Sequence, residues 1–265
     1  MTRAADLRKA VLARVRPTAR TAFYHRAPVR WAALPAVWWK QQRFPGYALS
    51  HLAFYDEDNA VGPVQRDEAL LLFALTRVLR PQVVVEVGFL GGQSSFNFLQ
   101  ALAPGARLYS FDIDPNAERI ARETFEAFPN FRFRRVSQEA ITPEHVDRQK
   151  IGLLFLDASH DLDLNQRTFD RLAPMLEDDG VLAVHDTGAW RRQHFGQLHQ
   201  AVAREHPQLW ASDDDFEHRR EERRFVNWVL EERPGYAQLH LHSRHTLRHG
   251  MTLLQRRGPL LTGAP

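Results

Sequence analysis

The sequence predicts an α/β fold with a doubly wound, Rossmann-like sheet of seven strands, mostly parallel and ending in a C-terminal antiparallel hairpin. Two observations predict this fold class. Between residues 65 and 188, short apolar runs alternate with segments of about 10–15 residues whose apolar positions recur at helical spacing. Such alternation requires crossover connections and a parallel sheet covered by helices on both faces. Near residue 250, two strand-like runs stand close together in the sequence, as in a hairpin.

The elements follow in order from local patterns. Apolar residues at helical spacing predict a helix over 65–79, which Pro81 ends. The β-branched run 83–87 then meets glycines, which is typical of a buried strand. The same criteria predict helices at 92–103, 115–128, 162–176, 193–206 and 225–232. They predict strands at 107–112, 131–136, 151–156, 181–184, 237–242 and 251–256. A turn is predicted at 177–180 and a solvated charged face at 213–224.

The chain is expected to have two parts. Residues 1–64 contain five prolines and several aromatic clusters, so only short helices fit there. The aromatic side chains need burial, either in the core or in a substrate lid or dimer arm. A membrane-surface helix around Trp38, Trp39 and Arg43 is a weaker alternative. Residues 65–265 are expected to form the main domain, with a variable insert around 189–235.

Composition excludes several classes of protein. The chain has 265 residues, no cysteine and a formal net charge of +3. The absence of cysteine excludes disulfides, thiolate metal sites and a cysteine nucleophile. The charge is too small to indicate a nucleic-acid partner. The longest apolar run, 69–75, is far short of the ~20 residues that span a bilayer, and no signal peptide is visible. These features predict a soluble, cytoplasmic protein.

Ligands of open parallel sheets bind beyond the carboxyl ends of the strands. Two of the predicted strand ends carry residues suited to a nucleoside ligand. Segment 86–94 reads EVGFLGGQS, and its glycines allow a close backbone approach to a ligand. It lacks the dinucleotide fingerprint, because Leu90 stands where the second glycine would be. Asp112 ends the next strand and can accept hydroxyl groups of a ribose, whereas Asp114 before Pro115 is placed to cap a helix.

Three further strand ends carry polar residues. Ser137 and Gln138 can hydrogen-bond the edge of a base. Asp157 and Asp186 end two buried strands and would repel each other unless a cation lay between them, which suggests Mg²⁺. His160 beside these acids is a candidate general base, and His185 is a weaker candidate. Each of these polar residues also has a purely structural interpretation.

In their order, these motifs resemble those of class I S-adenosylmethionine (SAM)-dependent methyltransferases. The similarity covers residues 65–188 and is greatest to small metal-dependent O-methyltransferases of the catechol and macrolide-sugar types. Two departures stand out, namely Thr187 in place of an asparagine metal ligand and the 64-residue N-terminal segment. The resemblance implies that Glu86, Gly88 and Gly92 shape the SAM site and that Ser94 binds the methionine carboxylate. Asp112 would bind the ribose, Ile113 would cover the adenine face, and Ser137 and Gln138 would contact the adenine edge. Asp157 and Asp186 would bind a metal, Asp157 would also lie beside the cofactor, and His160 would be the base.

The expected function is therefore methyl transfer from SAM to a hydroxyl group of a small specialised metabolite, such as a sugar or a polyketide-derived aromatic, with Mg²⁺ assisting. One alternative is a nicotinamide-dependent (NAD-type) oxidoreductase on the same sheet. Another is a non-catalytic protein that keeps the SAM fold for binding or assembly. A homodimer is expected from the aromatic N-terminal segment, and the acceptor pocket is expected to involve residues 1–64 and 189–235.

Overall fold

The fold is known from a computed structural model, which describes residues 49–55, 64–188, 221–233, 235–242 and 250–257. The chain divides into two compact units, residues 1–49 and 50–265. Everything below concerns the second unit. None of the helices described has the length and apolar character needed to cross a bilayer.

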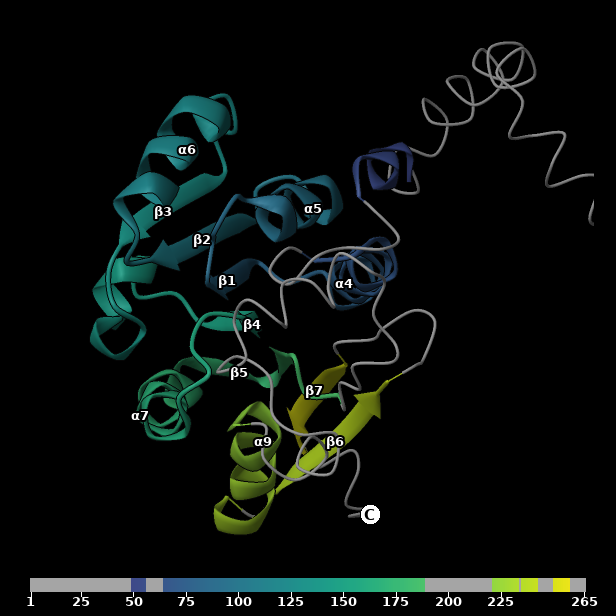
Figure 1. The fold of residues 1–265 in the computed structure, drawn as a ribbon, viewed down its shortest axis with the longest axis vertical. Coiled ribbons are helices and arrows are strands. Elements are labelled where there is room, and N and C mark those ends of the chain that lie inside the picture. The colour runs from purple at the N-terminus through teal and green to yellow at the C-terminus, as the bar shows by residue number, and fades with distance from the viewer. Residues whose placement is uncertain (1–48, 56–63, 189–220, 234, 243–249, 258–265) are drawn as a thin grey trace, which may run out of the picture. The chain divides into compact units, whose positions relative to one another are not determined.

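A seven-stranded sheet forms the centre of this unit, in the order β3-β2-β1-β4-β5-β7-β6 (Figure 1). The first five strands pair in parallel, whereas β7 is antiparallel to both β5 and β6. The predicted fold class is confirmed, including the C-terminal hairpin. The strands are β1 (Val83–Val87), β2 (Arg107–Asp112), β3 (Phe131–Arg135), β4 (Ile151–Leu156), β5 (Leu176–His185), β6 (Tyr236–Leu241) and β7 (Met251–Arg256).

Helices cover both faces of the sheet, as the parallel topology requires (Figure 1). Two hydrophobic clusters fill the two interfaces. One joins the sheet to α7 and α9, and the other joins it to α4, α5 and α6. Strands β1 and β4 are buried along their whole length because both faces are covered. The helices are α4 (Arg66–Leu79), α5 (Gln93–Ala101), α6 (Pro115–Phe125), α7 (Leu162–Leu172) and α9 (Glu221–Glu232), with 3-10 turns η2 (Ser50–Phe54), η3 (Gln138–Ala140), η4 (Pro143–Val146) and η5 (Ala173–Met175).

Strand β5 begins earlier than the sequence predicts. The pairing of β5 with β4 shifts register between Ile151 and Leu153, which face Leu176 and Val181 respectively. The predicted turn at 177–180 is therefore an irregular stretch inside the strand rather than a separate loop. A shift of this kind places extra residues on one strand only, which hydrophobic alternation does not reveal.

The described end of the N-terminal segment packs on the domain. Leu52 and Tyr55 are buried in the cluster that contains α4 and α5. The hydroxyl of Tyr55 donates a hydrogen bond to the carbonyl oxygen of Gln93 at 2.6 Å. Core packing thus holds for Leu52 and Tyr55. Positions 1–48 and 56–63, where a lid or dimer arm is predicted, and the predicted helix 193–206 lie outside the described residues.

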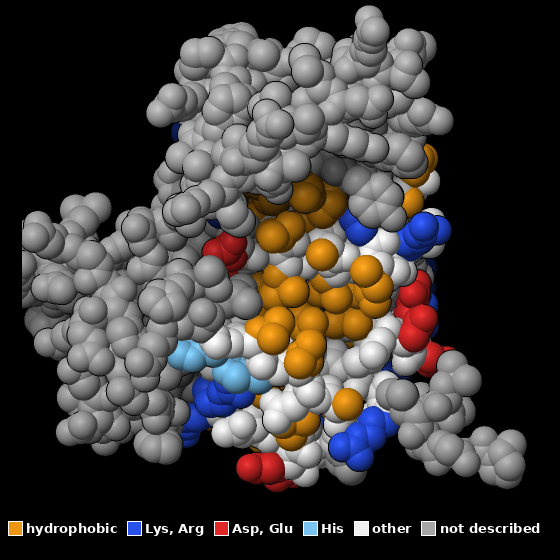
Figure 2. Space-filling model, turned by 90° about the vertical axis from the view of Figure 1, so that its right-hand side faces the viewer, with side chains coloured by type: hydrophobic (Ala, Val, Ile, Leu, Met, Phe, Trp, Pro, Cys, Tyr) orange, Lys and Arg blue, Asp and Glu red, His pale blue; other side chains and the backbone are white. Residues whose placement is uncertain are grey.

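One side of the described surface is rich in exposed apolar groups. Figure 2 shows hydrophobic side chains gathered at the centre of this side, with histidine and basic side chains next to them. Leu70 and Val78 on α4 are 40% and 79% exposed, and Leu239 on β6 is 54% exposed. Helix α4 therefore presents apolar residues both to the core and away from it.

Candidate active site

The carboxyl ends of the parallel strands surround one open cavity of about 580 Å³. Residues from all five parallel strand ends reach it, which is the position expected for a ligand of an open α/β sheet. The described residues that line it are Val87, Gly88, Leu90, Phe111, Asp112, Ile113, Val136, Ser137, Gln138, Asp157, Ala158, Ser159, His160, Leu164 and Asp186.

The turn between β1 and α5 comes very close to β4. Gly88 has φ of +101°, and a Cβ atom there would lie 2.0 Å from the carbonyl oxygen of Asp157. Gly92 has φ of +83°, and its Cβ would lie 2.6 Å from the ring of Phe125. Only glycine fits both positions. Gly88 lines the cavity, whereas Gly92 is the N-cap of α5 and lies against the ring of Phe125 on α6.

Asp112 holds the backbone of this turn. Its Oδ2 accepts hydrogen bonds from the backbone N–H groups of Phe89 and Leu90, both at 2.9 Å, and its Oδ1 accepts one from Asp114 at 3.0 Å. Asp114 caps α6, as predicted, by accepting from the backbone N–H of Asn116 at 2.8 Å. Asp112 therefore joins the glycine turn to the end of β2 and also borders the cavity.

Two apolar side chains on the rim are exposed. Leu90 is 56% exposed and Ile113 is 69% exposed, and both line the cavity. Leu90 also has φ of +49°, a backbone conformation that costs a leucine energy. Ile113 is the residue for which contact with an adenine face is predicted.

Glu86 lies behind the cavity and is fully buried. Its Oε2 accepts hydrogen bonds from the hydroxyl groups of Ser95 and, at 2.5 Å, Ser110. Burial raises the pKa of Glu86 to about 7, although these hydroxyl groups and that of Ser94 oppose the shift. Glu86 and Ser94 thus lie together under the turn, and neither lines the described cavity.

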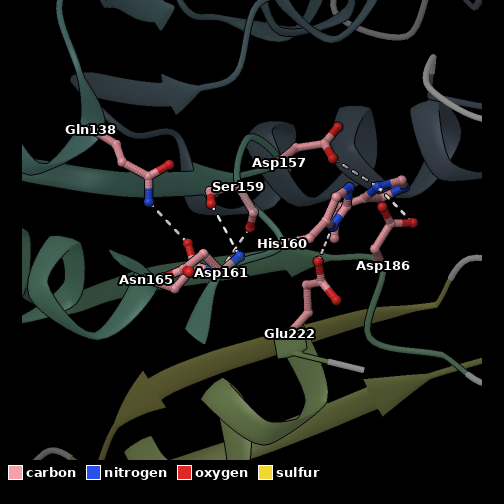
Figure 3. A network of polar contacts seen from close by, with 9 residues as sticks. Gln138, Asp157, Ser159, His160, Asp161, Asn165, Asp186 and Glu222 are labelled. Carbon is pink, nitrogen blue, oxygen red and sulfur yellow. Dashed lines mark hydrogen bonds and ion pairs between the residues drawn. The ribbon is translucent and has the colours of Figure 1, made fainter. Parts of the chain in front are cut away.

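Gln138 lines the cavity and also fixes helix α7. Its Nε2 donates a hydrogen bond to Oδ1 of Asn165 at 2.9 Å (Figure 3). It donates a second one to Oγ1 of Thr168, also at 2.9 Å. Both amide hydrogens are used in these contacts. The carbonyl oxygen of Gln138 is therefore the atom of this amide with capacity for a ligand.

A buried charged cluster follows β4 and β5. The imidazole Nδ1 of His185 lies 3.1 Å from Oδ1 of Asp157 and 3.5 Å from Oδ1 of Asp186, and Nε2 lies 3.2 Å from Oε2 of Glu68 on α4. Burial alone would lower the pKa of His185, but the three carboxylates raise it well above its usual value. Sequence reasoning treated His185 as doubtful and missed Glu68, for which α4 offers no motif.

His185 changes the interpretation of the two strand-end aspartates. Sequence analysis placed a metal ion between Asp157 and Asp186, and in the structure an imidazole with a raised pKa lies against both carboxylates. Asp186 has φ of +58°, a strained conformation that aims its side chain at this cluster.

The donor set still fits a divalent cation. Ligand atoms of Asp157, His185 and Asp186 all lie within 4.8 Å of one another. Carboxylate oxygens suit Mg²⁺ or Mn²⁺, and an imidazole ligand must be deprotonated to coordinate. The hydroxyl of Thr187, at the position of the expected third ligand, accepts a hydrogen bond from the hydroxyl of Thr252 at 2.8 Å. A cation bound here would compete with the proton of His185.

His160 contacts a residue that sequence analysis assigned to a solvated face. Its Nδ1 contacts Oε1 of Glu222, which lies in the first turn of α9 (Figure 3). Glu222 is buried, and Arg223 beside it donates hydrogen bonds to the carbonyl oxygen of Thr187 at 2.7 and 3.1 Å. The prediction of a solvated face is wrong for these two residues, because the helix begins at Glu221, four residues before its predicted start.

Residues 85–187 match a family model described as a methyltransferase domain. The matched residues make up less than half of the chain. The matched residues contain the glycine turn, Asp112, His160 and the three members of the buried cluster at the ends of β4 and β5. The predicted resemblance to class I SAM-dependent methyltransferases and the predicted enzyme class are confirmed. No curated protein sequence matches the chain. The oxidoreductase alternative finds no support in these comparisons.

Three solved methyltransferases have a fold similar to that of this chain. TomG from Streptomyces achromogenes, an O-methyltransferase involved in tomaymycin synthesis and solved with SAM, is 20% identical, with a TM-score of 0.52, over 74% of this chain and 82% of that one. The O-methyltransferase from Bacillus cereus, solved with S-adenosylhomocysteine (SAH), is 14% identical, with a TM-score of 0.52, over 85% and 90%. The SAH-bound Podospora anserina methyltransferase PaMTH1 is 16% identical, with a TM-score of 0.52, over 86% and 88%.

Proposed function

We propose that the protein transfers the methyl group of SAM to a hydroxyl group of a small molecule. The observation that carries this proposal is that the carboxylate of Asp112, exposed apolar side chains and His160 line one cavity. TomG and the Bacillus cereus protein are O-methyltransferases by name, which agrees with an oxygen acceptor. A sugar or a polyketide-derived aromatic is the proposed acceptor class.

In this proposal the cavity wall holds the donor. Asp112 accepts a ribose hydroxyl at Oδ1, which accepts one backbone hydrogen bond, whereas Oδ2 already accepts two. Ile113 covers one face of the adenine ring, and the carbonyl oxygen of Gln138, together with Ser137, meets the polar edge of the base. Gly88 lets the backbone approach the donor closely. Glu86, Gly92 and Ser94 support the turn, and contact of Ser94 with the methionine carboxylate is part of the same proposal.

The reaction needs alignment and removal of a proton. A sulfonium methyl group is already electrophilic, so the protein gains most by holding an oxygen atom in line with it. His160 takes the proton of that hydroxyl group. Asp157 and Asp186, with His185, would hold a divalent cation such as Mg²⁺. When bound, such an ion would lower the pKa of the acceptor hydroxyl.

Methyl transfer is the central test. The purified protein is incubated with methyl-labelled SAM and a panel of catechols and free or nucleotide-linked sugars. We expect label in at least one acceptor, and calorimetry is expected to detect binding of SAM but not of NAD. Binding of SAM without transfer to any hydroxyl acceptor would instead favour a non-catalytic binding protein, and binding of NAD alone would favour the oxidoreductase.

The base assignment has its own test. His160→Ala is expected to lower kcat about 100-fold or more with SAM affinity unchanged, because general-base assistance contributes on the order of 10²–10⁴-fold. Single-turnover measurements on the best acceptor of the panel check this. A normal rate would assign the proton to another group.

The ribose assignment is tested with Asp112→Ala. We expect SAM to bind at least tenfold more weakly, since a hydrogen bond to a charged group contributes about 1.5–3 kcal/mol. Isothermal calorimetry measures the affinity. Unchanged affinity would remove Asp112 from the donor site.

Metal dependence is tested by chelation. We expect EDTA to abolish turnover and added Mg²⁺ to restore it. Because the cation and the proton of His185 compete, metal binding is expected to strengthen as pH rises. Full turnover in EDTA would show that Asp157 and Asp186 act without a metal ion.

A further inference from the structure

Glu222 is far from His160 in sequence but contacts it in the structure. We propose that Glu222 is a positioning residue, whose carboxylate holds Nδ1 of His160 so that the other ring nitrogen receives the proton of the methyl acceptor. This inference rests on the proposed role of His160 as the base. No motif assigns Glu222, which lies outside the residues matched by the methyltransferase family model.

The position of Glu222 is fixed by the core and not by His160. Helix α9 buries Phe225, Val226 and Val229 against the sheet, and the ring of Phe225 lies 5.9 Å from that of Phe169 on α7. The hydrogen bonds from Arg223 to the carbonyl oxygen of Thr187 tie the same helical turn to the loop after β5. The first turn of α9 is thereby held beside His160, which lines the cavity.

The two partners differ sharply in burial. The side chain of Glu222 is 7% exposed, whereas that of His160 is 68% exposed. An exposed imidazole on a loop has several accessible rotamers, and a fixed carboxylate selects one of them. The buried acid therefore orients the exposed ring.

Hydrogen-bond chemistry then assigns the tautomer. A carboxylate only accepts, so the hydrogen of the neutral ring lies on Nδ1 when Oε1 of Glu222 is its partner. Nε2 is then the atom with a lone pair for the incoming proton. When that proton arrives, the imidazolium lies against a carboxylate, which stabilises it.

The surroundings of Glu222 argue against a merely structural ion pair. The described basic residues beside it have other partners. Arg224 pairs with Glu221 at 2.7 Å, and Arg223 contacts Thr187 and both ring nitrogens of His240. The part of the chain that the structure describes gives Glu222 one partner, His160. Burial of an acid whose partner is exposed lowers the stability of the folded protein, so stability does not explain this ion pair.

The first experiment observes the ring directly. Protein labelled with ¹⁵N-histidine and bound to SAH is examined by NMR, and His160→Gln identifies the signals of His160. We expect the wild type to carry hydrogen on Nδ1, and Glu222→Ala to lose this preference. Glu221→Gln, in the same turn, is the matched control and should leave the signals unchanged. Identical His160 signals in the wild type and in Glu222→Ala would overturn the inference.

The second experiment measures methyl transfer to the best acceptor of the panel. Glu222→Ala and the isosteric Glu222→Gln are each expected to lower kcat about 100-fold with the KM for SAM unchanged. Glu222→Asp keeps the carboxylate and should recover part of the rate. In the His160→Ala background, Glu222→Gln should have no further effect, because the residue acts through the imidazole. Thermal unfolding and SAH affinity show that each variant is folded.

Two outcomes distinguish failure of the positioning role from failure of the base assignment. Loss of rate in His160→Ala with normal rates in both Glu222→Ala and Glu222→Gln overturns the positioning role alone. A normal rate in His160→Ala overturns the base assignment, and the positioning role with it. Independent losses that add in the double variant also overturn the inference.

Discussion

At the scale of single residues, the site depends on backbone positions that few amino acids can occupy. Gly88 and Asp186 both have positive φ, at +101° and +58°, and both lie at strand ends that border the cavity. The glycine was predictable because a strand-to-helix turn that binds a ligand needs close backbone approach. The strain at Asp186 was not, because an aspartate in this conformation has no distinct sequence pattern.

Gly88→Ala is expected to destabilise the domain by about 2–4 kcal/mol, because the new Cβ would overlap the carbonyl oxygen of Asp157 at 2.0 Å. Chemical denaturation measures the loss. Gly105→Ala is the matched control, since Gly105 also has positive φ (+86°) but no atom within 4 Å of its Cβ position. The control should lose only about 1–2 kcal/mol. Equal losses would show that backbone strain alone matters.

Glu86 is expected to make stability depend on pH. Burial raises its pKa from 4.5 to about 7 in the folded state, so the folded protein binds this proton more tightly than the unfolded chain. The contribution to stability is therefore present below about pH 4.5 and is lost as pH rises through 7, a change on the order of 3 kcal/mol. Denaturation midpoints from pH 5 to 8 should fall less in Glu86→Gln than in the wild type. Parallel curves would contradict this assignment.

At the scale of elements, the helices that form the site are held by the two faces of the sheet. Alternation of strands and helices predicted β1 to β5 in order, and the sequence spacing predicted the hairpin of β6 and β7. The start of α9 could not be predicted from periodicity, because its first turn is charged and its apolar residues begin at Phe225. The contact of that turn with His160 spans 62 positions, which local patterns do not encode.

Phe225→Ala is expected to destabilise the domain by about 3–5 kcal/mol, since its ring is fully buried between α7 and the sheet. The same change should weaken the contact of Glu222 with His160, because it loosens the anchor of α9. Urea denaturation measures the first effect and the histidine NMR signals report the second. Val78→Ala, at a position that is 79% exposed, is the control and should cost under 1 kcal/mol. A loss no larger than the control would mean that α9 is not part of the cooperative core.

At the scale of the whole molecule, the order of the strands brings Asp112, Asp157, Asp186 and His160 to one cavity. That convergence follows from parallel pairing alone, which is why the sequence could predict it. Sequence analysis predicted a metal ion between the two aspartates, and the structure also places the imidazole of His185 against both carboxylates. Strand order does not determine which way such a side chain points, so this contact could not be predicted.

The homodimer remains a prediction. Exposed apolar residues on α4 and β6 agree with an association surface, since large apolar patches are uncommon on monomers (Figure 2). Light scattering is expected to give twice the chain mass of 30.6 kDa. A mass of one chain at micromolar concentration would contradict the prediction.

The placement of β7 between β5 and β6 has a consequence for synthesis of the protein. The strand that pairs with the Asp186 end of β5 leaves the ribosome long after β5 itself, because the helix α9 and strand β6 are made first. Until then one edge of β5 is open to wrong partners. A nascent chain stopped before Gly250 would therefore be aggregation-prone, although it already holds every residue of the proposed donor site.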